Sequence, residues 1–191
     1  LQAWLERAYG LSYRVDAIDR AVMVAASRQG IFHPVRQYLE SLRWDEKERL
    51  PTLFSRYFGA AESPYLALVG IWWPLSAVAR AMRPGVKVDT VLILEGKQGA
   101  HKSLALAVLA TCPAWAMDTA LPIGDKDAVA MMSGKWIVEF AELASWYGRR
   151  AELVKAFLTS QKDHFRPPYG RRAAGVPRSC VFAATTNEKT Y

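Results

Sequence analysis

The chain has 191 residues, of which 51% are hydrophobic and 23% charged, which is ordinary for a globular protein with a sizeable core. Its formal net charge of +7 favours an anionic partner, either a nucleic acid or a ligand that carries phosphate. Cys112 and Cys180 lie far apart in apolar runs, and the three histidines show no metal-ligand spacing. The composition therefore argues against a scaffold held by disulfides or metal, and it indicates reduced thiols in a cytoplasmic protein.

The first 85 residues show helical periodicity. We expect helices over residues 15–27, 34–42, 45–58 and 63–82, the third interrupted by Pro51 and ended by Gly59, and the fourth kinked near Pro74. The last of these helices begins with a long uncharged stretch, but this stretch falls short of the ~20 apolar residues that span a bilayer. We therefore predict an N-terminal α-helical subdomain over residues 1–85, with a buried helix and no membrane contact.

After Arg83-Pro-Gly85 the pattern changes to alternating strands and helices. We expect strands over residues 88–94, 115–117, 136–140 and 179–184, and helices over residues 102–110, 126–132 and 150–159. This alternation is typical of a parallel sheet that is covered by helices on both faces. The predicted fold class is therefore α/β, with a core over residues 86–191.

The most informative motif lies between the first of these strands and the helix that follows it. Gly96 and Gly99 allow the backbone to curl, and the helix points its N-terminal N–H groups at an anion. The pattern is close to that of a P-loop, in which Lys102 reaches the β/γ-phosphates and Ser103 ligates Mg²⁺. We therefore predict that ATP and Mg²⁺ bind the loop residues Gly96, Lys97, Gln98, Gly99, Ala100, His101, Lys102 and Ser103.

One position departs from the P-loop pattern. His101 stands where the pattern has glycine, and its Cβ is expected to crowd the turn and to weaken nucleotide affinity. The simpler alternative is a Lys-Ser pair that opens an ordinary helix near two glycines by chance. The apolar strand before the loop and the strong helix formers after it favour the phosphate-binding interpretation.

Two later strands also end in polar groups. Glu139 ends a buried strand and Glu142 follows it, which suits a carboxylate that holds Mg²⁺ or polarises the attacking water. The alternative is a strand whose glutamates mark its exit to solvent. Asn187 ends the last strand and is predicted to contact the γ-phosphate, although an asparagine in an ordinary turn is the alternative.

A basic segment between residues 159 and 179 alternates cations with rings. Point charges for phosphates and rings for base stacking make a usable contact surface for single-stranded DNA. The alternative is a solvated basic loop. The candidate DNA-binding residues are Lys162, Arg166, Tyr169, Arg171 and Arg172.

With these residues in view, roughly residues 30–191 closely resemble the virulence-associated protein E family, whose ATPase core is similar to superfamily 3 helicases. The resemblance rests on ordered motifs that include His33-Pro-Val-Arg36, Leu42-Arg-Trp-Asp45, Gly134-Lys-Trp-Ile-Val-Glu139, Arg166-Pro-Pro-Tyr-Gly-Arg171 and Thr185-Thr-Asn187. It implies a P-loop ATPase from a phage, prophage or mobile element in a bacterial host, with a primase-type domain upstream. In the family's terms, Lys102 and Ser103 would be the Walker A pair, Glu139 the Walker B acid and Asn187 sensor 1.

The resemblance also implies a homo-oligomeric ring in which a neighbour's arginine completes each site. The segment that supplies this arginine follows the sensor strand in such families, so we expect the present chain to be a piece of a longer protein, truncated at its C-terminus. The leading hypothesis is a helicase motor that acts on single-stranded or forked DNA. The alternatives are a nucleotide-gated DNA-binding or interference module that unwinds nothing and, with less support, a small-molecule kinase.

Overall fold

The computed structural model describes residues 1–29, 33–119, 121, 123, 126–141, 151–165 and 174–187. The chain divides into two compact units, Leu1–Pro34 and Val35–Tyr191. The helices between residues 35 and 85 pack in the same unit as the sheet. A functional boundary after residue 85 stays a prediction.

The N-terminal unit contains two helices, α1 (Gln2–Tyr9) and α2 (Val15–Gln29). The first ends at Gly10, which adopts a left-handed φ of 65° and returns its N–H to the last helical turn. The second matches the helical periodicity seen from Val15 onward.

The second unit begins with helices α3 (Pro34–Ser41), α4 (Leu53–Phe58) and α5 (Pro64–Met82), and a 3₁₀ turn, η1 (Leu50–Thr52), precedes α4. The predicted start of a helix at Asp45 was wrong. Glu46 has a positive φ of 63°, which a helix does not tolerate, and Asp45 instead pairs with Arg49. The predicted stop at Gly59 and the opening of α5 at Ser63, whose hydroxyl accepts from the Leu66 N–H at 3.1 Å, are confirmed.

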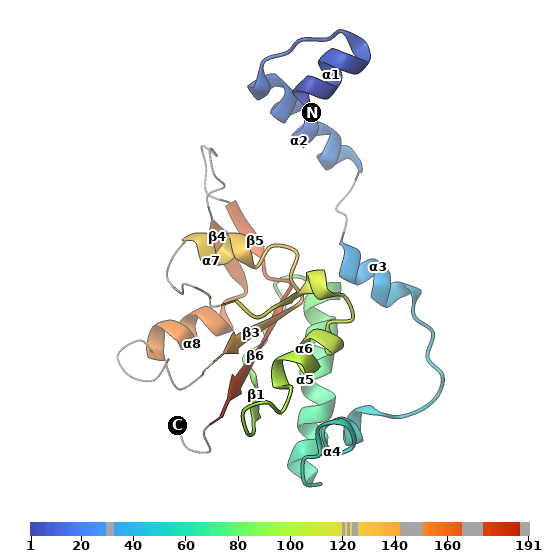
Figure 1. Ribbon diagram of the computed structural model, residues 1–191, viewed down its shortest axis with the longest axis vertical. Helices are drawn as coiled ribbons and strands as arrows, with labels where there is room; N and C mark the ends of the chain where they lie inside the picture. Colours follow the sequence, from blue (N-terminus) through green and yellow to red (C-terminus); the bar gives the residue numbers. More distant parts are fainter. Residues whose placement is uncertain are drawn as a thin grey trace. The chain divides into compact units, whose positions relative to one another are not determined.

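Four parallel strands form the main sheet, in the order β1-β6-β3-β2 (Figure 1). The strands are β1 (Leu92–Glu95), β2 (Ala116–Met117), β3 (Ile137–Ala141) and β6 (Val181–Thr186). The helices between them are α6 (Lys102–Leu109), α7 (Lys126–Met131) and α8 (Ala151–Thr159), with a 3₁₀ turn, η2 (Pro113–Trp115), before β2. The predicted α/β class with a parallel sheet is confirmed. The first strand begins at Leu92 rather than Val88, because its pairing with β6 begins there.

The two faces of the sheet are covered by different helices (Figure 1). Alternate residues of β6 show this, because Val181 and Ala183 join a core cluster with α5 and α6, whereas Phe182 and Ala184 join one with α7 and α8. A strand that is buried on both faces reads as a continuous apolar run, which is how β6 appears in the sequence.

Helix α5 is long and apolar enough to cross a membrane by length and composition alone. It packs one face on the sheet, where Trp73 Nε1 donates to the Phe182 carbonyl at 3.0 Å, and Trp136 Nε1 of the sheet layer donates to the Ala77 carbonyl at 2.8 Å. The prediction of a buried helix is therefore correct for one face. The other face is exposed, with Tyr65, Leu68, Trp72 and Leu75 on it.

The predicted basic loop contains a hairpin of two antiparallel strands, β4 (Lys162–Phe165) and β5 (Ala174–Pro177). Its base is held by Arg178, which is buried and forms a two-pronged ion pair with Asp163 while also donating to the Phe157 carbonyl of α8. The guanidinium lies 4.6 Å from the centre of the Phe157 ring. The hairpin therefore has a firm root, joined directly to the amino end of β6.

Candidate functional site

The loop between β1 and α6 turns sharply before the helix begins. Gly99 has a φ of 79°, and His101 has φ 55° and ψ 30°, which is left-handed backbone. The Ala100 N–H donates to the Lys97 carbonyl at 3.3 Å, and the Ala105 N–H donates to the His101 carbonyl at 2.9 Å, which starts α6. The segment is thus a curled connection, as a phosphate-binding loop requires, rather than extended strand or continuous helix.

His101 occupies a conformation that glycine prefers. A left-handed φ costs an L-residue about 1–2 kcal/mol, less for residues such as histidine that visit this region more often. The backbone of His101 is therefore strained. This strained residue lies directly before Lys102 and Ser103, which are predicted to bind phosphate and Mg²⁺.

The Lys102 ammonium folds back over the loop. Its Nζ donates to the Gly96 carbonyl at 2.7 Å, the Lys97 carbonyl at 3.0 Å and the Asn187 side-chain oxygen at 2.9 Å. Lys102 and Asn187 were predicted from different strand ends, and β6 lies beside β1 with Leu94 opposite Thr185. The sheet topology therefore brings these two predicted site residues into direct contact.

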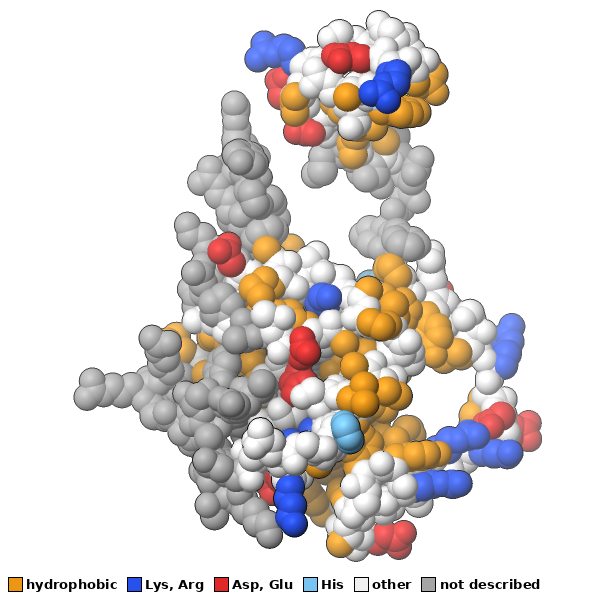
Figure 2. Space-filling view, viewed as in Figure 1, with side chains coloured by type: hydrophobic (Ala, Val, Ile, Leu, Met, Phe, Trp, Pro, Cys, Tyr) orange, Lys and Arg blue, Asp and Glu red, His pale blue; other side chains and the backbone are white. Residues whose placement is uncertain are grey.

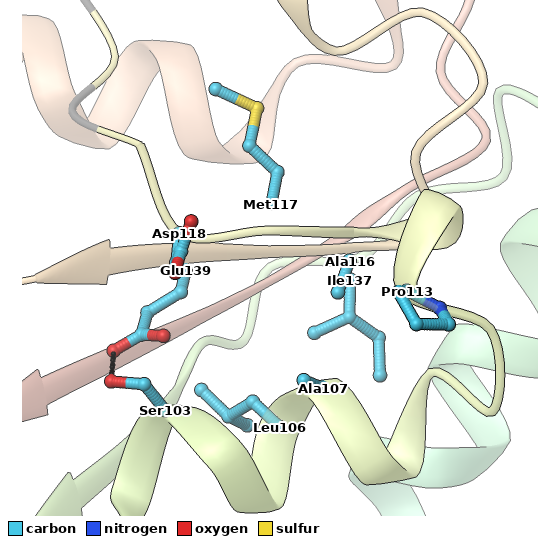
Figure 3. A pocket seen from close by; sticks show the side chains of 9 residues that line it. All are labelled: Ser103, Leu106, Ala107, Pro113, Ala116, Met117, Asp118, Ile137 and Glu139. Carbon is cyan, nitrogen blue, oxygen red and sulfur yellow. Dashed lines mark hydrogen bonds between the residues drawn. The ribbon is translucent and has the colours of Figure 1, made fainter.

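Glu139 lies in β3 and is only 3% exposed. One of its oxygens, Oε1, accepts a hydrogen bond from Ser103 Oγ at 2.7 Å (Figure 3). The same oxygen accepts a second one from Thr185 Oγ1, also at 2.7 Å. Ser103 and Glu139, which were each predicted to hold Mg²⁺, thus contact each other directly between α6 and β3. The contribution of Thr185 was not predicted. It lies on the same sheet face as Glu139, because Glu139 pairs with Ala183 and Thr185 is two residues further along β6.

A pocket of about 200 Å³ opens beside this contact, between α6, the turn η2 and strands β2 and β3 (Figure 3). Ligand pockets are typically about 300–1,000 Å³, so this one suits part of a ligand. Asp118, the residue after β2, lines it together with Ser103 and Glu139. Asp118 was also missed, although the rule that polar groups gather at strand ends applies to it as it does to Glu139.

Other predicted site residues lie elsewhere or outside the described residues. Glu142 and the hairpin residues Arg166, Tyr169, Arg171 and Arg172 fall outside them. Lys162 is exposed on β4. The hairpin that begins with Lys162 joins the amino end of β6, whereas Asn187, which contacts Lys102, follows the carboxyl end of β6. The hairpin and the loop before α6 therefore lie toward opposite ends of the sheet (Figure 1).

The two cysteines and the side chains of metal-binding types are further candidate reactive groups. Burial raises the pKa of the Cys180 thiol to about 11, so the predicted buried thiol stays protonated at neutral pH. Among the described residues, no group of three His, Cys, Asp or Glu side chains could hold a metal ion. A cation at Ser103 and Glu139 would therefore depend on further ligands, such as phosphate oxygens.

Comparison with known protein families assigns the chain to one of them. The model of the virulence-associated protein E-like domain matches residues 39–191. The chain belongs to this family. The resemblance drawn from the motifs is thus confirmed.

Among solved structures, the chain is similar to the C-terminal region of NrS-1. One apo structure aligns at a TM-score of 0.48 with 15% identity and covers 81% of this chain and 35% of that one. Two further apo structures give TM-scores of 0.40 and 0.37, with 18% and 17% identity, over 53% and 52% of this chain and 24% and 25% of theirs. The chain thus spans about a quarter to a third of the length of those chains. A comparison with curated proteins found no match.

Proposed function

We propose that the chain is the ATP-binding and ATP-hydrolysing domain of a phage or mobile-element DNA replication protein, with a P-loop fold, and that it acts as a helicase motor on single-stranded DNA. One observation carries the proposal. Lys102, Ser103, Glu139 and Asn187 come from three segments of the chain and meet in two direct contacts at the carboxyl edge of a parallel sheet. Family membership supports the link to replication.

The phosphate-binding role follows from what Lys102 contacts. Its three oxygen partners satisfy the ammonium, and the oxygens of a triphosphate can replace them at little cost because they are stronger, charged acceptors. The first N–H groups of α6 lie beside it and have no carbonyl partner within the helix. The Asn187 amide, released from Lys102, is then placed to contact the γ-phosphate.

The residues present also fit Mg²⁺. The Ser103 hydroxyl and the Glu139 carboxylate are hard oxygen donors held together in one contact, and they would hold the ion. Bound there, the ion would neutralise charge on the transferred phosphoryl group. Thr185 donates to the same Glu139 oxygen and helps to hold the carboxylate in place. Glu142 is proposed as the carboxylate that orients the attacking water.

The hairpin is the proposed contact with DNA. Its base is fixed by the buried Arg178–Asp163 pair. Lys162 opens β4, and the two strands flank in sequence the segment that holds Arg166, Tyr169, Arg171 and Arg172. In the longer protein we expect a homo-oligomeric ring in the cytoplasm of a bacterial host, with each site completed by a neighbouring subunit's arginine and with a primase-type domain upstream.

The test compares DNA-stimulated ATP hydrolysis in the full-length protein and in Lys102→Ala. Loss of one electrostatic contact to the transition state is expected to lower turnover by about 10²- to 10³-fold. Lys47→Ala, at an exposed lysine far from the loop in sequence, serves as the control. Equal turnover in the Lys102 variant and the control would refute the proposal.

A second candidate function is a nucleotide-gated DNA-binding module that unwinds nothing. The strained backbone at His101 favours it, because a loop that binds nucleotide weakly suits a switch better than a motor. A strand-separation assay on forked DNA decides between the two. Binding of ATP and DNA without strand separation, in the full-length protein, would favour this alternative.

A further inference from the structure

Asp118 and Glu139 occupy equivalent positions on neighbouring strands. Strands β2 and β3 pair in parallel, with Ala116 opposite Ile137 and Met117 opposite Val138. Asp118 directly follows the last residue of β2, and Glu139 is the next residue of β3. Because residues alternate between the faces of a sheet, both follow Ala116 and Ile137 onto the face that packs against α6.

Both carboxylates line the same pocket, beside Ser103 (Figure 3). None of the nine described residues that line this pocket is basic. The ammonium of Lys102, the residue before Ser103, donates to two loop carbonyls and to Asn187. Two carboxylates and a hydroxyl beside one pocket supply the hard oxygen donors that a divalent cation such as Mg²⁺ prefers.

We infer that Asp118 is the second carboxylate of the divalent-cation site, and that together with Ser103 and Glu139 it holds the hydrated Mg²⁺ of bound Mg·ATP. The inference rests on the proposed function and adds to it one more residue of the Mg²⁺ site. Mg²⁺ in such sites keeps several of its waters and is bound through one or two carboxylates besides the phosphates. Asp118 is exposed, so its carboxylate can reach a metal-bound water.

The experiment measures Mn²⁺ binding by electron paramagnetic resonance, with a nonhydrolysable ATP analogue present and the full-length protein throughout. The variants are Asp118→Asn, which keeps shape but loses charge, and Asp118→Glu, which keeps charge. Asp19→Asn, in the N-terminal unit, is the matched control. Nucleotide affinity without metal is measured for each variant in EDTA.

We expect Asp118→Asn to weaken Mn²⁺ binding by about tenfold or more, in line with residues that support metal ligands, and to leave nucleotide affinity in EDTA unchanged. Asp118→Glu should recover part of the lost Mn²⁺ affinity. If Asp118→Asn fails to fold, the Glu variant alone decides, since it should still bind Mn²⁺ with altered affinity or relaxation.

Three results separate the possible failures. If the wild-type protein binds no nucleotide in any buffer, the proposed function fails. If wild type binds Mn²⁺ and nucleotide but Asp118→Asn and Asp118→Glu match Asp19→Asn, only the inference about Asp118 is overturned. If Asp118→Asn also loses affinity in EDTA, the residue supports the pocket structurally and the inference is again overturned.

Discussion

The ammonium of Lys102 donates a hydrogen bond to the side-chain oxygen of Asn187 at 2.9 Å, although 85 residues separate them in sequence. The contact exists because β6, which precedes Asn187, pairs with β1, which precedes the loop. Lys102, proposed to bind phosphate, and Asn187, proposed to sense it, are therefore in direct contact without nucleotide.

Thr185 is expected to position Glu139. Thr185→Val removes one of the two hydroxyls that donate to Glu139 Oε1, so the carboxylate loses orientation while Ser103 still contacts it. We expect a loss of about 1–2 kcal/mol in the free energy of unfolding, by urea denaturation, and a fall in kcat with little change in KM for ATP. Thr90→Val, at an exposed position, is the control. Unchanged kcat would remove Thr185 from the site.

His101→Gly is expected to relax the loop. Glycine relieves the left-handed strain but adds freedom to the unfolded chain, so the free energy of unfolding should change by less than about 1 kcal/mol. Affinity for an ATP analogue, measured by isothermal titration calorimetry, should rise. Thr111→Gly is the matched control, because Thr111 also has a positive φ, of 63°, but lies beyond the far end of α6. An increase in affinity in both variants, or in neither, would contradict this expectation.

Asp163→Asn is expected to destabilise the hairpin root. Arg178 is buried and loses its only paired anion among the described residues, and removing one partner of a buried ion pair costs about 3–5 kcal/mol. Asp16→Asn breaks an exposed pair with Arg20 and should cost less than about 1 kcal/mol. Urea denaturation of both variants checks the difference. Similar losses in the two would show that the buried pair contributes no more than a surface pair.

Cys180 is expected to make stability fall at high pH. Burial raises its pKa from 9.0 to about 11, so between these values the unfolded thiol loses its proton while the folded one keeps it. Ionisation then favours the unfolded state, and the free energy of unfolding should fall by roughly 1.4 kcal/mol per pH unit between pH 9 and 11. Cys180→Ala should remove this slope. Cys112→Ala, at a partly exposed thiol, should retain it.

Much of the sheet layer was predictable, because its strands and helices differ in period. Strand β6 and helix α6 are long apolar runs bounded by polar residues, and their limits were correct within a few residues. The hairpin strands β4 and β5 were not predicted from periodicity, because they are short and lie in a basic, proline-containing segment. The false helix start at Asp45 shows how a good capping residue is overruled by the backbone that follows it.

The site was predicted in its main contacts but not in its supporting ones. Lys102 and Ser103 open a helix, Asn187 follows a strand, and Glu139 is a carboxylate within an apolar strand, so each could be predicted from sequence position. The roles of Thr185 and Asp118 follow from the sheet face on which each lies. The role of Asp118 also requires that β2 lies beside β3. That order of strands comes from tertiary packing, which local patterns do not encode.

Strand β6 joins the two ends of the molecule's proposed activity. It is buried on both sides between β1 and β3, its amino end receives the hairpin, and its carboxyl end leads to Asn187. At about 3.3 Å per residue its six residues span roughly 20 Å. We therefore expect a force on the hairpin along this axis to be transmitted through β6 to Asn187. Because β6 pairs with β1 and β3, we expect the same force to reach the loop that holds Lys102 and the strand that holds Glu139.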